Sequence, residues 1–415
     1  MSRFCRGTIN FSSQDIQAFF WGLLSRNKPG ESLVTKFEND FAAYVQVKKA
    51  IAVSCAKTAL SLGLKVLGAQ AGDEIIVTSY TVTEVIDVII SSNLRPIFID
   101  ISLGDGNMDP DLIEPKITDK TKFILITHMH GNPGDLDRLL NIADKYRLTV
   151  IEDAAQACGA EYKAKKTGGF GKIAYFSFNM FKNLNTLGGA MLVTDDPKLA
   201  ADLRQMLTGF RQISKATLIL RFLKAAILAW LTRPFVFTWL IYPLLSLIGK
   251  QRDENISKTL KVKILNQAEL DRFNVLFSPA QASVGLIQLK NLDKLNQEKI
   301  NKAEVLNQGL SKVRQVSIFN QQKSVKNIYL NYVIRVADRQ KLISFLFAQG
   351  IDLSPGFVRA CAYVKEFSAY AADCPNSLIL EQENVYLPLY SPLTASDTRK
   401  IAELIEKYYE TKTRI

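Results

Sequence analysis

Polar and titratable residues follow four apolar runs in the first half of the chain. The runs AIAVSC, EIIVTSY, KFILITHMH and LTVIEDA lead into the polar stretches 54–58, 78–80, 128–131 and 153–156. If these runs are parallel strands, their carboxyl ends meet at one edge of a sheet, which is where ligands bind in open α/β proteins. We therefore expect this edge to hold the chemistry of the chain.

His128 and His130 are the only histidines, two residues apart. A zinc site would need further cysteine or acidic ligands at suitable spacing, and none accompanies the pair, so no metal is expected. His128 is expected either to line the substrate side of the site or to be a hydrogen-bonded structural residue. The five cysteines are scattered without a CxxC pair, which favours a reducing cytoplasm.

Short β-rich runs alternate with helical runs from about residue 41 to about residue 194. This βαβ alternation predicts a mainly parallel sheet with helices on both faces. Amphipathic helices and short strands after about residue 271 predict a smaller α+β domain. The expected division is an N-terminal segment (1–30), a large domain (31–210), an apolar segment (211–255) and a small C-terminal domain (256–415).

The apolar stretch 216–249 carries only three charges, Arg221, Lys224 and Arg233, and Pro234 divides it into two arms of roughly 16 residues. Each arm would span about 25 Å, less than the roughly 30 Å hydrocarbon core of a bilayer. We expect an apolar helical insertion that lies on, or dips into, one membrane face. A helical pair buried in a dimer interface or under the small domain is the alternative.

Basic residues flank this stretch, namely Arg211, Lys215, Lys250 and Arg252. Positive flanks are typical of the cytoplasmic side of a membrane. The expected location is therefore cytoplasmic, as a peripheral or monotopic protein on the inner face of the cytoplasmic membrane.

Two stretches are more distinctive, VIEDAAQACGA and, about 20 residues downstream, FSFNMFKNLNTLGGAMLVT. Together with GDEIIVTSYT, RPIFIDI, THMHGNPGDLD, QASVGLIQL and VYLPLYSPLT, they make the chain resemble the DegT/DnrJ/EryC1/StrS aminotransferases over nearly its whole length outside the apolar stretch. The resemblance implies an α/β fold of fold type I with a seven-stranded type of sheet, pyridoxal 5′-phosphate bound by 31–210, and a homodimer with shared active sites. Family members aminate keto groups, mostly on nucleotide-linked sugars.

The resemblance also assigns roles to motif residues. Lys182 occupies the position of the catalytic lysine, an amine that holds the cofactor aldehyde as a Schiff base and later moves a proton. Asp153 matches the carboxylate that keeps the cofactor's ring nitrogen protonated. Gln156 resembles a ring-contacting glutamine and Ser177 a phosphate-binding hydroxyl, with plain packing or capping roles left open for both.

Other site positions depart from the family pattern. The phosphate cradle at a helix N-terminus reads Ala56-Lys57 where Gly-Thr is usual, and Lys57 either pairs with phosphate or is solvated. Asn274 falls where relatives reach across the dimer to a neighbour's phosphate. Val82 replaces an aromatic residue that commonly stacks on the cofactor, and Leu276 replaces an arginine. We expect a substrate side that is more apolar and less cationic than usual.

These features predict an aminotransferase that passes an amino group, with glutamate as the expected donor, to a keto group on a sugar or on a lipid-linked, membrane-embedded acceptor. Its pathway would be amino sugar or aminolipid biosynthesis. Alternatives are a soluble nucleotide-sugar aminotransferase whose apolar stretch serves only dimer packing, a related dehydratase or decarboxylase, and a non-catalytic sensor or scaffold. The net charge of +12 is spread along the chain, so nucleic acid is not an expected partner.

Overall fold

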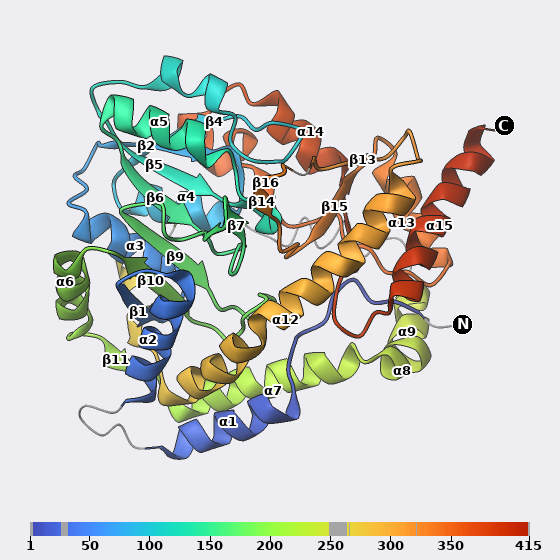
Figure 1. Ribbon diagram of the computed structural model, residues 1–415, viewed down its shortest axis with the longest axis horizontal. Helices are drawn as coiled ribbons and strands as arrows, with labels where there is room; N and C mark the ends of the chain where they lie inside the picture. Colours follow the sequence, from blue (N-terminus) through green and yellow to red (C-terminus); the bar gives the residue numbers. More distant parts are fainter. Residues whose placement is uncertain (1–2, 26–31, 249–263, 265, 321, 414–415) are drawn as a thin grey trace.

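The computed structural model describes residues 3–25, 32–248, 264, 266–320 and 322–413. Its centre is a seven-stranded sheet in the order β1-β10-β9-β6-β5-β2-β4 (Figure 1). The strands are β1 (Lys49–Val53), β2 (Glu74–Thr78), β4 (Arg95–Ile99), β5 (Thr121–Thr127), β6 (Thr149–Asp153), β9 (Ile173–Ser177) and β10 (Ala190–Thr194). Strand β10 runs antiparallel to both of its neighbours, and the other neighbouring pairs are parallel. The predicted mainly parallel sheet is confirmed.

Helices cover both faces of this sheet, as its strands require because their side chains are apolar on both sides. One face is covered by α3 (Ala56–Val66), α4 (Thr83–Ser91) and α6 (Pro197–Leu207), which pack on alternate strand residues such as Ile151 and Tyr175. The opposite face is covered by α2 (Leu33–Val45), α5 (Leu136–Tyr146) and the first half of α12 (Pro279–Leu310). Asp153 and Ser177 continue the alternation on the α3 side of the sheet.

A second core lies around the three-stranded sheet β13-β15-β17. Its elements are β13 (Ser317–Ile318), β15 (Tyr332–Arg335), β17 (Asn384–Leu387), α13 (Arg339–Ala348) and α15 (Ala395–Thr413). Helix α12 joins the two cores, because it buries Leu292 against the large sheet and Leu306 and Leu310 in the second core. This arrangement positions the second core beside the ends of the large-sheet strands (Figure 1).

The apolar stretch forms two arms, as expected. The first is α7 (Lys215–Leu231); the second contains α8 (Pro234–Val236), η4 (Phe237–Ile241) and α9 (Tyr242–Ile248), and the arms meet at 64°. Neither arm nor any other described helix has the length and hydropathy to cross a membrane alone, whereas the two arms meet that criterion as a bent pair. The expected flanking charges at Lys250 and Arg252 lie outside the described residues.

Helix α1 (Ser13–Leu24) lies beside α7 along the first half of α12 (Figure 1). Phe19 of α1 stacks on Phe222 of α7 with ring centres 4.6 Å apart. Gly22 allows α1 to approach α12 closely, because a Cβ there would stand 2.6 Å from the Pro279 carbonyl oxygen. Helices α1 and α7 therefore form one layer. The domain boundaries expected from the sequence stay predictions.

Candidate active site

A cavity of about 1450 Å³ opens at the carboxyl ends of β6 and β9. Its walls come from the first turns of α3 and α4, the loop after β9, helix α7, helix α12 and the second core. The predicted site residues that line it are Ala56, Lys57, Val82, Asp153, Gln156, Ser177 and Lys182. Residues separated by more than a hundred positions in the sequence thus meet in one place, as the strand-end argument predicts.

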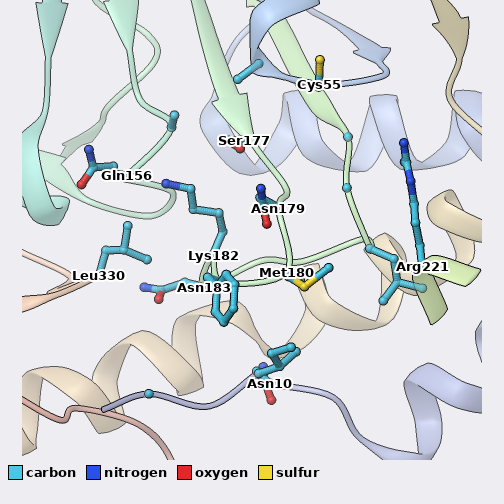
Figure 2. A pocket seen from close by; sticks show the side chains of 18 of the residues that line it. Asn10, Cys55, Gln156, Ser177, Asn179, Met180, Lys182, Asn183, Arg221 and Leu330 are labelled. Atoms are coloured by element: carbon cyan, nitrogen blue, oxygen red, sulfur yellow. The ribbon is translucent and has the colours of Figure 1, made fainter. Parts of the chain in front are cut away.

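Lys182 lies in the loop between β9 and β10. Its backbone N–H donates to the Asn179 carbonyl at 2.9 Å, and its side chain extends towards Gln156 in the cavity (Figure 2). Desolvation lowers the pKa of Lys182 to about 8, although the charges of Asp153 and Glu84 oppose this shift. A larger fraction of neutral amine is therefore present near neutrality than for a lysine in water, as a nucleophile requires.

Asp153 ends β6 and is almost completely buried. One carboxylate oxygen accepts a hydrogen bond from the backbone N–H of Ala155 at 3.0 Å. Desolvation raises the pKa of Asp153 above its usual value, while the nearby charge of Lys182 lowers it. A buried carboxylate of this kind favours a cationic ring nitrogen as its neighbour.

Gln156 follows Asp153 by three residues and is buried at the cavity wall. Its side-chain oxygen accepts a hydrogen bond from the backbone N–H of His130 at 3.2 Å, and its amide nitrogen lies 3.3 Å from the Met129 sulfur. These contacts fix the amide plane beside the Lys182 amine (Figure 2).

The first turn of α3 and the end of β9 together form an anion cradle. Cys55, the residue before α3, makes no side-chain cap, so the first N–H groups of the helix are open to a ligand. The hydroxyl of Ser177 faces the same cavity. Lys57 also lines the cavity, with its amine 5.5 Å from the Phe273 ring centre, and whether it pairs with phosphate stays a prediction.

This donor set fits pyridoxal 5′-phosphate. An amine, a buried carboxylate and an open helix N-terminus with a hydroxyl beside it are the three groups that its aldehyde, ring nitrogen and phosphate need. All three open into one cavity that is large enough for the cofactor and a second molecule. No group of three or more possible metal ligands occurs among the described residues.

His128 does not line the cavity, so of the two roles left open for it the structure supports the hydrogen-bonded structural one. It is fully buried, and its Nε2 lies 3.1 Å from a carboxylate oxygen of Glu152. Glu152 also accepts hydrogen bonds from the backbone N–H groups of Gly168, Phe170 and Gly171. Because Glu152 precedes Asp153 in a strand, it points to the opposite face, where the pair is structural.

Asn274 and Leu276 do not line the cavity of their own chain either. Asn274 donates a hydrogen bond to Asp271 at 3.0 Å, and Leu276 lies in the short strand β12 (Val275–Leu276), paired with β11 (Arg211–Gln212). The loop that carries them contacts α3, since Thr58 of α3 donates a 3.4 Å hydrogen bond to the Phe273 carbonyl. The role of Asn274 at a partner's site stays a prediction.

The expectation that the substrate side is less cationic than in the family stays a prediction, whereas the cavity of this chain is itself strongly cationic. The cavity is lined by nine Lys and Arg residues, namely Arg6, Lys57, Lys182, Arg211, Arg221, Lys224, Arg233, Arg272 and Lys299, and by only two acids, Glu84 and Asp153. The expectation rested on Leu276, which stands where relatives have an arginine, and left out the cations of α7. Their spacing of three residues, Arg221 and Lys224, was the available signal, because it places both on one side of a helix.

The sequence analysis also missed Tyr175 and Lys299. Tyr175 lines the cavity two residues before Ser177, on the same face of β9, so strand alternation alone could have identified it. Lys299 of α12 lines the cavity more than a hundred residues after Lys182, and desolvation lowers its pKa to about 8. Nothing in its local sequence distinguishes it from the exposed lysines nearby.

The chain is similar to known proteins over most of its length. The profile of the DegT/DnrJ/EryC1/StrS aminotransferase family matches residues 25–218 and 244–406, which leaves 219–243 outside the match. The spore coat polysaccharide biosynthesis protein SpsC of Bacillus subtilis is 28% identical over 90% of this chain and 88% of its own length. The dTDP-3-amino-3,4,6-trideoxy-alpha-D-glucose transaminase of Streptomyces venezuelae is 39% identical over 41% of this chain and 45% of its own length.

Solved structures share the fold. DesV of S. venezuelae, crystallised with a ketimine intermediate, superposes with a TM-score of 0.78 at 23% identity, covering 98% of this chain and 99% of DesV. The aminotransferase of Psychrobacter cryohalolentis gives a TM-score of 0.78, also at 23% identity, over 97% of this chain and 98% of its own. The fold-type I architecture follows from these superpositions.

Proposed function

The chain belongs to the DegT/DnrJ/EryC1/StrS aminotransferase family of pyridoxal-phosphate enzymes, and we propose that it aminates a keto sugar with Lys182 as its catalytic lysine. The observation that carries this proposal is that Lys182 and Asp153 line one cavity and that their charges interact there. The bound cofactor supplies an electron sink for the bonds that are made and broken at the amino carbon.

We assign each of the remaining roles to a particular side chain. Lys182 would hold the cofactor's aldehyde and, as a free amine, would move a proton. Asp153 would favour the protonated ring nitrogen, and the first turn of α3 with Ser177 would hold the phosphate. Gln156 and Val82 line the same cavity and would lie beside the ring.

The substrate assignment rests on the relatives. SpsC is named for polysaccharide biosynthesis, and the S. venezuelae transaminase for a dTDP-linked amino sugar. We infer a keto sugar as the acceptor and glutamate as the amino donor. A homodimer would bring Asn274 of each chain to the other chain's cofactor phosphate, where the family places such an asparagine.

We further propose that the acceptor sugar is carried by a lipid at the inner face of the cytoplasmic membrane. Large apolar side chains are exposed on α1, on α7 and on the second arm. They are Phe20, Trp21, Leu24, Ile219, Leu220, Leu223, Ile227, Trp230, Phe235, Trp239, Leu240, Leu244 and Leu247. We name this set the apolar surface; an exposed patch of this kind marks a membrane or protein contact.

Charge favours the membrane as the partner of the apolar surface. Its edges carry exposed Arg211, Lys215 and Arg233, which would face anionic headgroups. The same helix α7 forms a wall of the cavity, so a lipid-borne sugar could reach Lys182 from the bilayer. A soluble nucleotide sugar remains the second candidate, supported by the names of the relatives.

Two measurements test these proposals. Purified protein with cofactor should show the absorbance of a lysine-linked cofactor, which Lys182→Ala should abolish; its absence in the wild type would overturn the enzyme assignment. The protein loaded with the amino form of the cofactor is then incubated with keto-sugar nucleotides or with lipid extracts. Return of the aldehyde form only with the nucleotides would refute the lipid-borne acceptor.

A further inference from the structure

Helix α7 presents three distinct faces, because successive residues of an α-helix are rotated by about 100°. Leu218, Phe222 and Ala225 form the first face and are buried against α1. The second face, with exposed Ile219, Leu220, Leu223, Ile227 and Trp230, belongs to the apolar surface. The third face, with Thr217, Arg221 and Lys224, lines the active-site cavity. One helix therefore joins the expected membrane contact to the site of chemistry.

Arg221 is the most enclosed cation on the cavity face of α7. It packs beside Gly188, where a Cβ would stand 2.9 Å from the Arg221 Nη1, so the glycine makes room for the guanidinium. Desolvation lowers the pKa of Arg221 below its usual value. No carboxylate pairs with Arg221 or Lys224 within the described part of the chain. A partly desolvated cation without a counter-charge favours an anionic ligand.

Two anions could bind Arg221, namely the cofactor's phosphate and an anionic group of the substrate. Arg221 lines the same cavity as Cys55, Ala56 and Lys57 at the start of α3, where the cofactor's phosphate is expected. The cofactor phosphate already has the first N–H groups of α3 and the Ser177 hydroxyl as donors. Lys224 follows one turn further along α7 and is exposed at the cavity wall. The two cations therefore extend from the cradle towards the apolar surface.

We propose that Arg221 and Lys224 bind the diphosphate that joins the acceptor sugar to its carrier. This inference rests on the proposed aminotransferase function and deepens it by naming a substrate-recognition element. Side chains three residues apart on a helix have Cβ atoms about 5–6 Å apart, a spacing that suits two linked phosphate groups. The pair also supplies positive charge in a chain that has Leu276 where the family pattern has an arginine. Nucleotide and polyprenyl carriers share this diphosphate chemistry.

The test measures inorganic diphosphate binding to the cofactor-saturated enzyme by calorimetry. The variants are Arg221→Gln, Lys224→Gln and their combination, with Lys215→Gln as the matched control. Lys215 is a cation of the same helix that does not line the cavity. We expect the dissociation constant for diphosphate to rise at least tenfold in the double variant and less than twofold in Lys215→Gln.

Competition then identifies the carrier. UDP and phosphatidylcholine vesicles containing a polyprenyl diphosphate are each tested for displacement of inorganic diphosphate, and displacement by either supports the site. Unchanged diphosphate binding in the double variant, or an equal loss in Lys215→Gln, would overturn the inference. So would a tenfold loss of cofactor affinity without loss of diphosphate binding, because it would assign the cations to the cofactor. Failure of the proposed function is a separate outcome, recognised by wild-type protein that lacks the lysine-linked cofactor absorbance.

Discussion

Lys299 of α12 donates a 2.6 Å hydrogen bond to the side-chain oxygen of Asn183, the residue that follows Lys182. Asn183 in turn donates a 2.8 Å hydrogen bond to Asn296, one turn earlier on α12. The loop that carries the catalytic lysine is thus attached to the helix that joins the two cores. Small displacements of a catalytic group cost rate, so this attachment should matter for turnover.

We predict that Lys299→Met lowers kcat by about tenfold to a hundredfold, because it leaves Asn183 without its charged donor. Lys299→Arg should recover part of the loss, since it can still donate to Asn183. Lys302→Met is the matched control: Lys302 lies one turn further on and, among the described residues, donates to the carbonyls of Tyr390 and Ser391 and not to Asn183. Steady-state kinetics with wild-type kcat in Lys299→Met would contradict the positioning role.

The lowered pKa of Lys182 predicts how cofactor capture depends on pH. Only the neutral amine attacks the aldehyde, and its fraction rises with pH until the pH reaches the pKa of about 8. The rate of linkage, followed by absorbance after mixing cofactor-free protein with pyridoxal 5′-phosphate, should therefore rise about tenfold per pH unit below 8 and level off above it. A rate that keeps rising to pH 10 would mean that the site does not lower the pKa of Lys182.

Asp153→Asn should separate cofactor linkage from catalysis. A neutral amide cannot hold a proton on the ring nitrogen, so conversion of the cofactor to its amino form by glutamate should slow by on the order of a hundredfold or more. The covalent link at Lys182 should still form, because its amine remains. Stopped-flow spectra report both steps, and a near-normal conversion rate would remove Asp153 from its assigned role.

The His128–Glu152 pair should affect stability and not substrate recognition. His128→Phe removes one hydrogen-bond donor of the buried Glu152, which keeps its three backbone donors, so it should lower the free energy of unfolding by about 1–3 kcal/mol. Urea unfolding measures this change, with His130→Asn for comparison. A raised KM for the acceptor with unchanged unfolding would instead return His128 to the substrate side.

The apolar surface predicts binding to anionic vesicles. Replacing Leu220, Leu223 and Ile227 together by Gln should weaken flotation with phosphatidylglycerol vesicles by more than tenfold, since each side chain contributes about 1.5–3 kcal/mol when buried in an apolar environment. Leu112→Gln, at an exposed leucine outside this surface, is the control. Equal flotation of the triple variant and the wild type would exclude this surface as the membrane contact. Deletion of 216–249 is less informative, because α7 also forms part of the cavity wall.

Much of the fold was predictable because local periodicity determines it. The alternation of apolar β-rich and helical runs predicted the parallel strands and the edge at which Asp153, Gln156 and the start of α3 lie, whereas the roles of Asp153 and Gln156 came from the family resemblance. The reversed direction of β10 was not predictable, because an apolar run such as AMLVT is equally suited to either direction. Its reversal depends on the turn at Gly188 and Gly189, both with positive φ.

The substrate side was less predictable because it depends on contacts between distant segments. In the HMH sequence, alternation could not show whether either histidine would enter the cavity, and neither lines it. The structure buries His128 against Glu152 and turns His130 into a left-handed conformation with φ of 58°. Likewise, the cations of α7 could be placed in the cavity only once the position of α7 beside α1 was known.

Borohydride reduction tests the central assignment most directly, because it fixes the cofactor to whichever lysine holds it. Four lysines line the cavity, namely Lys57, Lys182, Lys224 and Lys299, so the outcome is not trivial. We predict that peptide mapping by mass spectrometry finds the reduced cofactor on Lys182 alone. Modification of Lys57, Lys224 or Lys299 in its place, or no modified peptide after incubation with the cofactor, would contradict the assignment.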